Sequence, residues 1–212
     1  MERADDKAAG AKADGATTTV GRGDRPGWIV IVRHGQPDMD RKARLTWREY
    51  IEWWKGYDAA GLAPGEAPPE SLLALAREAD VLYASTLARA CETAAAIAGG
   101  REVIRDPVFI EAPLPPPPIF GRRKPRRWGV YARVFWWFGR AAGGETRRAA
   151  EQRAEAGAAT LAAQALRGHN VVLCAHGWFN RMMRPVLLSW GWKCVHDVGD
   201  DYWSYRKYVR RL

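Results

Sequence analysis

The fold of this sequence is decided by Trp28-Ile29-Val30-Ile31-Val32-Arg33-His34-Gly35. This stretch begins with a continuous apolar, β-branched run, which is typical of a strand buried on both faces of a parallel sheet. A second such run, residues 171–174, leads into Ala175-His176-Gly177. Ligands of open α/β sheets bind beyond the carboxyl ends of the strands. We therefore expect His34 and His176 to lie at the same edge of one sheet.

Strands and helices alternate along the rest of the chain, as apolar periodicity, capping residues and turn residues indicate. The predicted strands are 28–32, 81–84, 171–174 and 202–209, with short extended pieces at 103–104 and 108–110. The predicted helices are 46–54, 68–79, 87–98, 145–166 and 178–190. This order predicts an α/β fold, a three-layer α/β/α sandwich with a mostly parallel central sheet.

Residues 1–26 differ in composition from the rest of the chain. They are rich in Ala, Gly, Asp and Thr and lack the hydrophobic segment of a secretory signal, so we predict a disordered tail. Residues 27–212 are then expected to form one domain. The sequence has no run of about 18 apolar residues, so no transmembrane helix is predicted. The three cysteines are widely spaced, which favours reduced thiols in a cytoplasmic protein.

The chain is basic, with 33 Lys and Arg against 24 Asp and Glu and a net charge of +9. This excess favours anionic partners, namely phosphorylated small molecules, nucleic acid or acidic lipid. Charge alone does not distinguish them, no specific nucleic-acid partner is predicted, and the oligomeric state is left open. The 11 tryptophans indicate apolar walls, either in the core or around a site.

A third predicted strand ends in Ser85-Thr86-Leu87-Ala88-Arg89. This spacing places Arg89 in the first turn of the next helix, at the same edge of the sheet as the two histidines. A cation is mildly disfavoured at a helix start, and a phosphate between Arg89 and Arg33 would remove that conflict. Two guanidiniums and two imidazoles together favour a pocket for a phosphoryl group.

Two other interpretations are rejected. Residues 21–27 are rich in glycine, like a dinucleotide-binding loop, but they precede a strand instead of following one. His196-Asp197 suggests a metal-dependent phosphohydrolase, but the four histidines have spacings that do not supply a metal site. We therefore expect neither a metal nor an organic cofactor.

The motifs together resemble those of the histidine phosphatase superfamily, in its branch related to phosphoglycerate mutase. Arg33-His34-Gly35 matches the signature tripeptide, and Ser85-x-Leu87-x-Arg89-Ala90-x-x-Thr93-Ala94 matches the second arginine motif. Glu111 falls at the position of the acid, Gly144-Glu145-Thr146 resembles a glycine-glutamate element, and Ala175-His176-Gly177 matches the second histidine motif. Because several motifs occur in the right order, the resemblance implies a phosphoglycerate mutase-like fold.

The resemblance also implies a role for each residue. His34 attacks phosphorus and becomes a phosphohistidine, which divides one hard displacement into two easier ones. Arg33, Arg89 and His176 bind the phosphate oxygens, so that no metal is needed. Glu111 protonates the leaving oxygen and then deprotonates the attacking water. The alternatives for this acid are Asp38, Asp40 and Glu145.

The sequence departs from the family in two places. Mutase-type members carry Ser or Thr and then Asn shortly after the tripeptide, where this chain has Pro37 and Asp40. Residues 113–139 form a proline-rich, basic and aromatic insertion in place of the family's usual element after the acid. Within it, we expect residues 121–138 to form a helical lid over the site. The alternative for these residues is a contact with an anionic membrane surface.

These observations predict a metal-independent phosphatase that acts on a small anionic phosphoester through a phosphohistidine. The alternatives are a phosphoglycerate mutase-like phosphotransferase and a non-catalytic phosphate- or membrane-binding module on the same fold.

Overall fold

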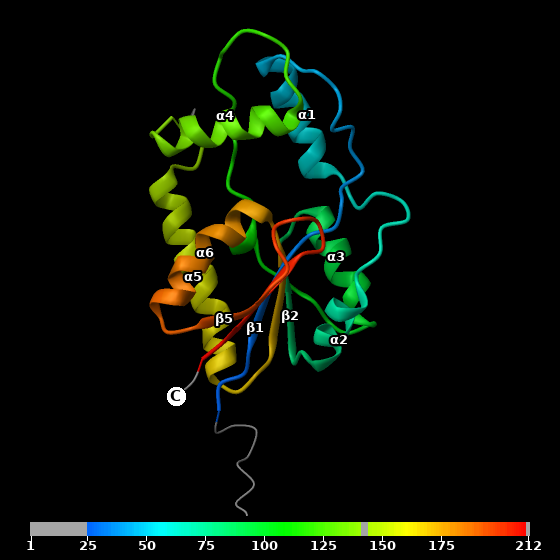
Figure 1. Ribbon diagram of the computed structural model, residues 1–212, viewed down its shortest axis with the longest axis vertical. Coiled ribbons are helices and arrows are strands. Elements are labelled where there is room, and N and C mark those ends of the chain that lie inside the picture. Colours follow the sequence, from blue (N-terminus) through cyan, green and yellow to red (C-terminus); the bar gives the residue numbers. More distant parts are fainter. Residues whose placement is uncertain (1–24, 141–143, 211–212) are drawn as a thin grey trace, which may run out of the picture.

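The computed structural model describes residues 25–140 and 144–210, so residues 1–24 of the predicted tail lie outside the described part. A six-stranded sheet runs through the centre in the order β3-β2-β4-β1-β6-β5 (Figure 1). The strands are β1 (Ile29–Arg33), β2 (Val81–Ala84), β3 (Ile104–Arg105), β4 (Val171–Ala175), β5 (Lys193–Asp197) and β6 (Tyr205–Val209).

Parallel pairing builds the half of the sheet that carries the two predicted histidines. β1 pairs in parallel with β4, β4 with β2, and β2 with β3. β6 and β5 add two antiparallel pairings at the other edge. Ile29 lies opposite Val171 and Arg33 opposite Ala175, so the two strands that precede the histidines end level with one another. The prediction of a mostly parallel sheet is confirmed.

Helices cover both faces of this sheet. Alternate residues of β1 point to opposite faces: Ile29 and Ile31 pack with residues of α5 and α6, whereas Val30 and Val32 pack with residues of α2 and α3. The predicted three-layer sandwich is therefore also confirmed. The covering helices are α2 (Glu70–Glu78), α3 (Ala88–Ala98), α5 (Arg147–Leu166) and α6 (Gly177–Ser189).

Two more helices, α1 (Trp47–Ala59) and α4 (Pro125–Trp137), lie above the carboxyl ends of the parallel strands (Figure 1). α1 begins with the predicted capping box. The backbones of Leu45 and Arg123 join the N-terminal ends of the two helices, because each N–H donates to the other residue's carbonyl (2.9 and 2.8 Å). We call this helix pair the roof.

One predicted element has another structure. Residues 108–110, predicted to be extended, overlap a 3₁₀ helix at Pro107–Phe109. The Asp106 carboxylate accepts a hydrogen bond from the backbone of this turn (2.8 Å), and the proline ring fixes a compatible φ angle. Local capping thus overrides the β-branched pattern that suggested a strand.

The antiparallel edge also differs from the prediction. The sequence does not predict β5, because all five of its residues are exposed and they carry no apolar pattern. The strand predicted from residue 202 begins only at Tyr205, because residues 198–204 form a loop that reaches the site.

Candidate active site

His34 follows β1 directly, and only 2% of its surface is exposed. Its Nδ1 atom lies 2.7 Å from the carbonyl oxygen of Gly35. A carbonyl oxygen only accepts hydrogen bonds, so Nδ1 carries the proton and Nε2 carries the lone pair. The Nε–H of Arg89 donates to this Nε2 atom over 3.3 Å. A nucleophile that accepts a phosphoryl group needs such a lone pair.

The surroundings of His34 keep its ring neutral near pH 7. Burial and then the positive charge of Arg89 lower the pKa of His34 well below its usual value, and Arg33 acts in the same direction. The hydrogen bond to Gly35 opposes them without reversing the shift. A neutral imidazole can attack phosphorus, whereas an imidazolium has no lone pair to use.

His176 follows β4 and faces His34, with the two ring centroids 5.2 Å apart. Its Nε2 atom lies 2.8 Å from the hydroxyl of Ser85, and its buried Nδ1 atom has no hydrogen-bond partner among the described residues. Burial, followed by the proximity of His34 and Arg89, lowers the pKa of His176 well below its usual value. The structure thus brings both predicted histidines together at one edge of the sheet.

Arg89 lies in the first turn of α3, as predicted, and none of its surface is exposed. Besides the bond to His34, its guanidinium donates to the carbonyl of Tyr57 (2.8 Å) and to the carboxylate of Asp58 (3.1 Å). Burial raises the pKa of Asp58, and the charge of Arg89 opposes that rise. Because both acceptors belong to the last turn of α1, the roof supplies the counter-ion that holds Arg89 beside His34.

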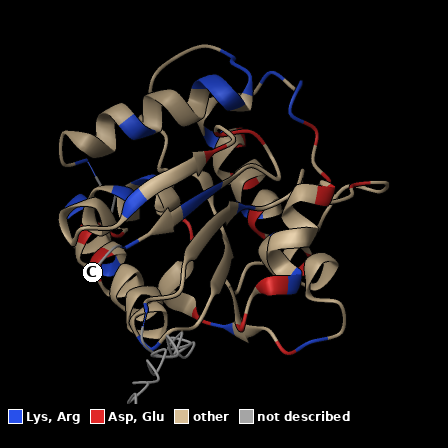
Figure 2. Cartoon of the chain, turned by 60° about the horizontal axis from the view of Figure 1, so that its bottom comes forward, with Lys and Arg blue, Asp and Glu red and all other residues tan. Residues whose placement is uncertain are grey.

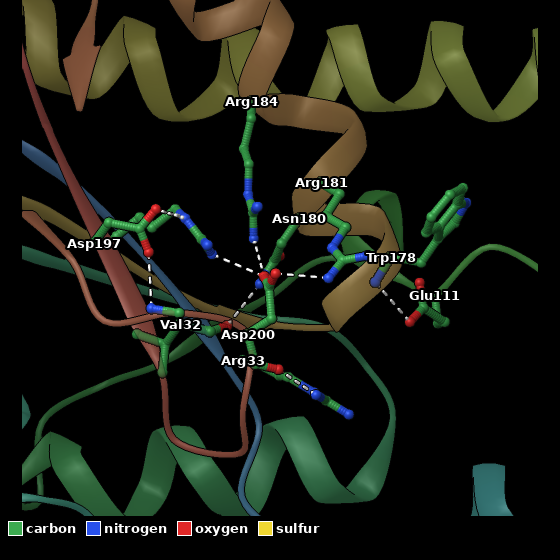
Figure 3. A network of polar contacts seen from close by, with 11 residues as sticks. Val32, Arg33, Glu111, Trp178, Asn180, Arg181, Arg184, Asp197 and Asp200 are labelled. Carbon is green, nitrogen blue, oxygen red and sulfur yellow. Dashed lines mark hydrogen bonds and ion pairs between the residues drawn. The ribbon is translucent and has the colours of Figure 1, made fainter. Parts of the chain in front are cut away.

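Arg33 is held by the loop between β5 and β6. Its guanidinium donates to the Asp200 carbonyl and lies 4.4 Å from the centroid of the Tyr202 ring. The Asp200 carboxylate accepts hydrogen bonds from Arg181 and Arg184 of α6 (2.6 Å each), which Figure 3 shows converging on it. Partial burial acts to raise the pKa of Asp200, but the two arginines hold it well below its usual range. The loop that carries Tyr202 is therefore fixed to α6.

Close packing in this pocket disfavours a side chain at two glycine positions. A Cβ on Gly35 would lie 2.5 Å from the ring of Trp203, which packs over the backbone after the nucleophile. A Cβ on Gly177 would lie 3.3 Å from the Nε atom of Arg33. The Gly35 N–H also donates to the hydroxyl of Thr93 (2.9 Å). The glycines that follow both histidines thus let side chains approach the backbone closely.

Glu111 lies at the N-terminal end of α6. Its carboxylate accepts hydrogen bonds from the backbone N–H groups of Trp178 (3.2 Å) and Phe179 (2.8 Å), and Figure 3 shows Glu111 beside Trp178. A helix N-terminus is a favourable place for a carboxylate. Arg153 of α5 donates to the carbonyl of Ile110, the preceding residue (2.5 Å). The backbone on both sides of the carboxylate is therefore fixed.

A cleft of about 1050 Å³ lies between these residues and the roof. Arg33, His34 and Glu111 all line it. The volume is at the upper end of the range for small-molecule sites. Both roof helices contribute residues spaced three, four and seven apart: Tyr50, Trp53, Trp54 and Tyr57 from α1, and Arg126, Gly129, Val130 and Arg133 from α4.

A family model for the histidine phosphatase superfamily (branch 1) matches residues 29–208. The chain belongs to this superfamily. The three residues that the resemblance implied to bind phosphate, Arg33, Arg89 and His176, surround His34, and Glu111 lines the cleft beside it. No curated protein matches the sequence.

Solved structures share the fold of this member of the superfamily at low identity. Phosphoglycerate mutase from Bacillus anthracis has a TM-score of 0.57 at 16% identity, with 90% of this chain and 93% of that chain covered. A mycobacterial glucosyl-3-phosphoglycerate phosphatase has a TM-score of 0.54 at 20% identity, with 85% and 92% covered. Phosphoserine phosphatase from Entamoeba histolytica has a TM-score of 0.53 at 18% identity, with 77% and 80% covered. The likeness shows a phosphoglycerate mutase-like fold.

The alternative acids that the sequence offered lie elsewhere. Glu145 forms an ion pair with Arg153 (2.7 Å), and Asp40 accepts a hydrogen bond from the backbone of an exposed turn (2.7 Å). Neither these two carboxylates nor Asp38 is among the described residues that line the cleft. Glu111 is therefore the best placed of the four candidates.

Three further residues at the site were not predicted from the sequence. Tyr202 lies with its ring centroid 5.6 Å from that of His34, Asp58 pairs with Arg89, and Arg133 lines the cleft from α4. Tyr202 sits in a loop, and the other two sit on helices whose position over the sheet no local pattern gives. No local pattern points to any of these three residues. The aromatic spacing of residues 50–57 marks only one face of the helix that carries Asp58 and lines the cleft.

Within residues 25–140 and 144–210, no three His, Cys, Asp or Glu side chains form a group that could hold a metal ion. His196, half of the suggested metal pair, instead stacks on Tyr205 with the ring centroids 5.4 Å apart. Across the same residues, no helix is both long enough and apolar enough to cross a membrane.

Proposed function

We propose that this histidine phosphatase hydrolyses a phosphate monoester through a phosphohistidine on His34. One observation carries the proposal: the ring of His34 is buried, its Nδ1 atom lies against the Gly35 carbonyl, and its Nε2 atom lies beside the guanidinium of Arg89. Burial and the charge of Arg89 lower the pKa of His34, which favours the neutral ring. This arrangement supplies a nucleophile and a cation at the same point, as phosphoryl transfer requires.

The reaction has two displacements. In the first, Nε2 of His34 forms a bond to phosphorus while the bond to the leaving oxygen breaks, and Glu111, which must enter this step in its protonated form, gives that oxygen its proton and becomes the carboxylate. In the second, Glu111 takes a proton from water, the water oxygen bonds to phosphorus, and the bond to Nε2 breaks with release of inorganic phosphate. Arg33, Arg89 and His176 stabilise the phosphoryl oxygens in both steps. Neither step uses a metal or a cofactor.

Hydrolysis, in preference to phosphate transfer between two hydroxyls, is supported by the open cleft. A mutase must keep water from its phosphoenzyme and hold the bisphosphate intermediate until that intermediate returns a phosphoryl group to the histidine. Here the cleft has room for water beside the leaving group, and Pro37 and Asp40 replace the mutase-type residues.

Phosphorus NMR of a reaction with 3-phosphoglycerate, run as one of a panel of phosphoesters, tests this choice. We expect inorganic phosphate to appear from the panel, at rates that His34→Ala abolishes. Conversion of 3-phosphoglycerate into 2-phosphoglycerate without release of phosphate would identify a mutase. Tight phosphate binding with no turnover of any substrate would identify a non-catalytic module.

The outer side of α4 favours a second interaction, with an anionic membrane surface. An exposed apolar stripe lies at Val134 and Trp137 of the helix and at Phe138, which follows it, and Phe120 in the preceding loop is 97% exposed. Basic residues precede the stripe, and α4 carries no Asp or Glu (Figure 2). Apolar and basic side chains on one exposed surface fit an interfacial helix.

We propose that this stripe rests on acidic lipid. The protein should co-sediment with vesicles that contain phosphatidylserine and much less with neutral phosphatidylcholine vesicles. Trp137→Gln with Phe138→Gln should reduce the bound fraction, whereas Leu188→Gln, at an exposed apolar residue of α6, should not. Equal sedimentation of wild type and the double variant would exclude the contact.

A further inference from the structure

The two roof helices present different chemistry to the cleft. On α1 the aromatic rings form flat, mutually stacked panels: Tyr50 and Trp53 have centroids 5.6 Å apart at 13°, and Trp54 and Tyr57 have centroids 5.2 Å apart at 25°. Trp53 and Trp54 are only half-buried, so part of each ring remains uncovered. Such a surface fits a flat group of a ligand.

On α4 the cleft-facing residue Arg133 is a cation without a counter-ion. Its guanidinium is half-buried, lies 4.8 Å from the Trp178 ring centroid, and makes no hydrogen bond or ion pair with any described residue. Burial lowers the pKa of Arg133, and the charge of Glu111 opposes that shift. No hydrogen bond or ion pair joins Glu111 to Arg133; the Glu111 carboxylate instead accepts from the N-terminal backbone of α6.

The side chains around Arg133 have an excess of unpaired donors. Three buried nitrogen atoms lack a hydrogen-bond partner in the described structure and belong to residues that line the cleft: Nε of Arg33, Nε of Arg133 and Nε1 of Trp178. All three are donors, and no unpaired buried acceptor belongs to a cleft-lining residue. Burying a donor without a partner is costly. An oxyanion would bring acceptors and negative charge to this part of the cleft.

We propose that the substrate is a phosphate monoester whose leaving group carries both a planar ring and a second oxyanion, with the ring against the α1 aromatics and the oxyanion at Arg133. The proposal rests on the proposed function, because it describes the leaving group of that reaction. The phosphate binds at His34, and the roof selects what is attached to it.

Other basic residues near the cleft do not replace Arg133. Arg41, Lys124 and Arg126 also line the cleft but are exposed, so water and salt screen them. Arg181 lines it too but is paired with Asp200. A partly desolvated guanidinium without a counter-ion gains more from an anion. The position of Arg133, one turn beyond Gly129 on the cleft-facing side of α4, therefore makes it the residue that selects the second charge.

Binding of three phosphonates, which cannot be hydrolysed, tests the proposal by calorimetry. Benzylphosphonate has a ring and no second charge, 4-carboxybenzylphosphonate and its 3-carboxy isomer have both, and 5-phosphonopentanoate has the charge without the ring. For wild type we expect at least one carboxy isomer to bind about 10–100 times more tightly than benzylphosphonate, the range for a charge-assisted hydrogen bond.

Arg133→Met should remove most of this preference. Arg127→Met is the matched control, because Arg127 lies on the same helix, is exposed and does not line the cleft, so it should keep the preference. The two variants carry the same change in net charge. If wild type shows no preference for either carboxy isomer, or if both variants lose it equally, the assignment of the oxyanion to Arg133 is wrong.

A second comparison tests the planar ring of the ligand. Wild type should bind the preferred carboxy isomer several times more tightly than 5-phosphonopentanoate, and Trp54→Leu should reduce that ratio while a melting curve reports whether the variant is folded. Equal binding of the two ligands by wild type would exclude the ring. These binding measurements do not depend on turnover. Binding as expected without hydrolysis would contradict the proposed function alone. Hydrolysis without the binding preferences would contradict this inference alone.

Discussion

We call the side chains at the carboxyl ends of the strands, Arg33, His34, Arg89 and His176, the floor of the cleft. The floor and the roof are built in opposite ways. In the floor, His34, Arg89 and His176 are buried and bound to neighbouring groups, at the ends of strands and in the first turn of a helix that the sheet holds in place. In the roof, Arg133 is a half-buried cation without a partner in the described chain, on a helix that long loops connect to the sheet. The floor holds its side chains in place before a ligand arrives, although Nδ1 of His176 and Nε of Arg33 have no hydrogen-bond partner in the described chain, whereas the roof leaves a whole guanidinium without a counter-ion there.

This difference separates chemistry from selection. A change in the floor should affect every phosphoester alike, because each must pass its phosphoryl group to the same atom. A change in the roof should alter the ranking of substrates and leave the chemical step in place.

The largest expected effect is that of His34→Ala. Without Nε2 there is no phosphoryl acceptor, and turnover should fall by about 10⁴-fold or more on every substrate, the scale seen when a nucleophile is removed. Phosphate release measured over a substrate panel reports the loss, and circular dichroism checks the fold. If His34→Ala keeps a tenth of the wild-type turnover on any substrate, the assignment of the chemical step to the floor is wrong.

Glu111→Gln should have the next largest effect. The amide keeps the shape but neither gives nor takes the catalytic proton, so turnover of alkyl phosphates should fall by about 10²–10⁴-fold. The loss should be smaller for 4-nitrophenyl phosphate, whose leaving group departs without a proton. The matched control is Asp40→Asn, at an alternative acid in an exposed turn.

Equal losses on both kinds of substrate would contradict protonation of the leaving group by Glu111. A large loss in Asp40→Asn with none in Glu111→Gln would transfer the role to Asp40.

The floor was predictable from the sequence because its residues are tied to strand ends. Buried apolar runs locate β1 and β4, and each histidine follows its strand by a fixed number of residues, so sheet register alone brings the two rings together. The family resemblance then supplied Glu111, whose place at the start of α6 no local pattern indicates.

The roof was predictable only as a pair of helices. The capping box at Thr46 marks the start of α1, and the 121–138 stretch was expected to form a helical lid. The bridge between Leu45 and Arg123 and the ion pair from Asp58 to Arg89 depend on contacts between segments far apart in the chain. Such contacts are set by packing, which periodicity within one segment does not report.

The neutral histidines of the floor should also make stability depend on pH. Burial lowers the folded-state pKa of His34 and His176, so below about pH 6.5 the unfolded chain takes up protons that the folded protein does not. The free energy of unfolding should therefore fall with decreasing pH, by up to about 1.4 kcal/mol per pH unit for each histidine. Urea titrations between pH 8 and pH 5 measure this slope.

His34→Ala should flatten that slope, because one of the two proton-binding differences is removed. An unchanged slope in the variant would mean that the pKa of His34 does not change on folding, which would contradict a histidine kept neutral by burial.

The smallest expected effect belongs to the mouth of the cleft. Lys124→Gln with Arg126→Gln removes two exposed charges that line it, and KM for a multiply charged phosphoester should rise about two- to fivefold at low salt. The effect should fade at 0.5 M salt, because screening already removes the attraction, and kcat should not change. A tenfold or larger loss that persists in high salt would mean that the mouth binds the substrate directly and would weaken the contrast with Arg133.

Trapping the phosphoenzyme is the most direct test of the nucleophile. Wild type is mixed rapidly with 4-nitrophenyl phosphate, quenched in base, where phosphohistidine survives, and digested for mass spectrometry, with His34→Ala as the control. We expect one phosphoryl group on the peptide that contains His34, lost on brief exposure to acid, formed as fast as nitrophenol is released, and absent from the variant. Continued turnover with no phosphate on His34, or with phosphate on another side chain, would contradict the mechanism.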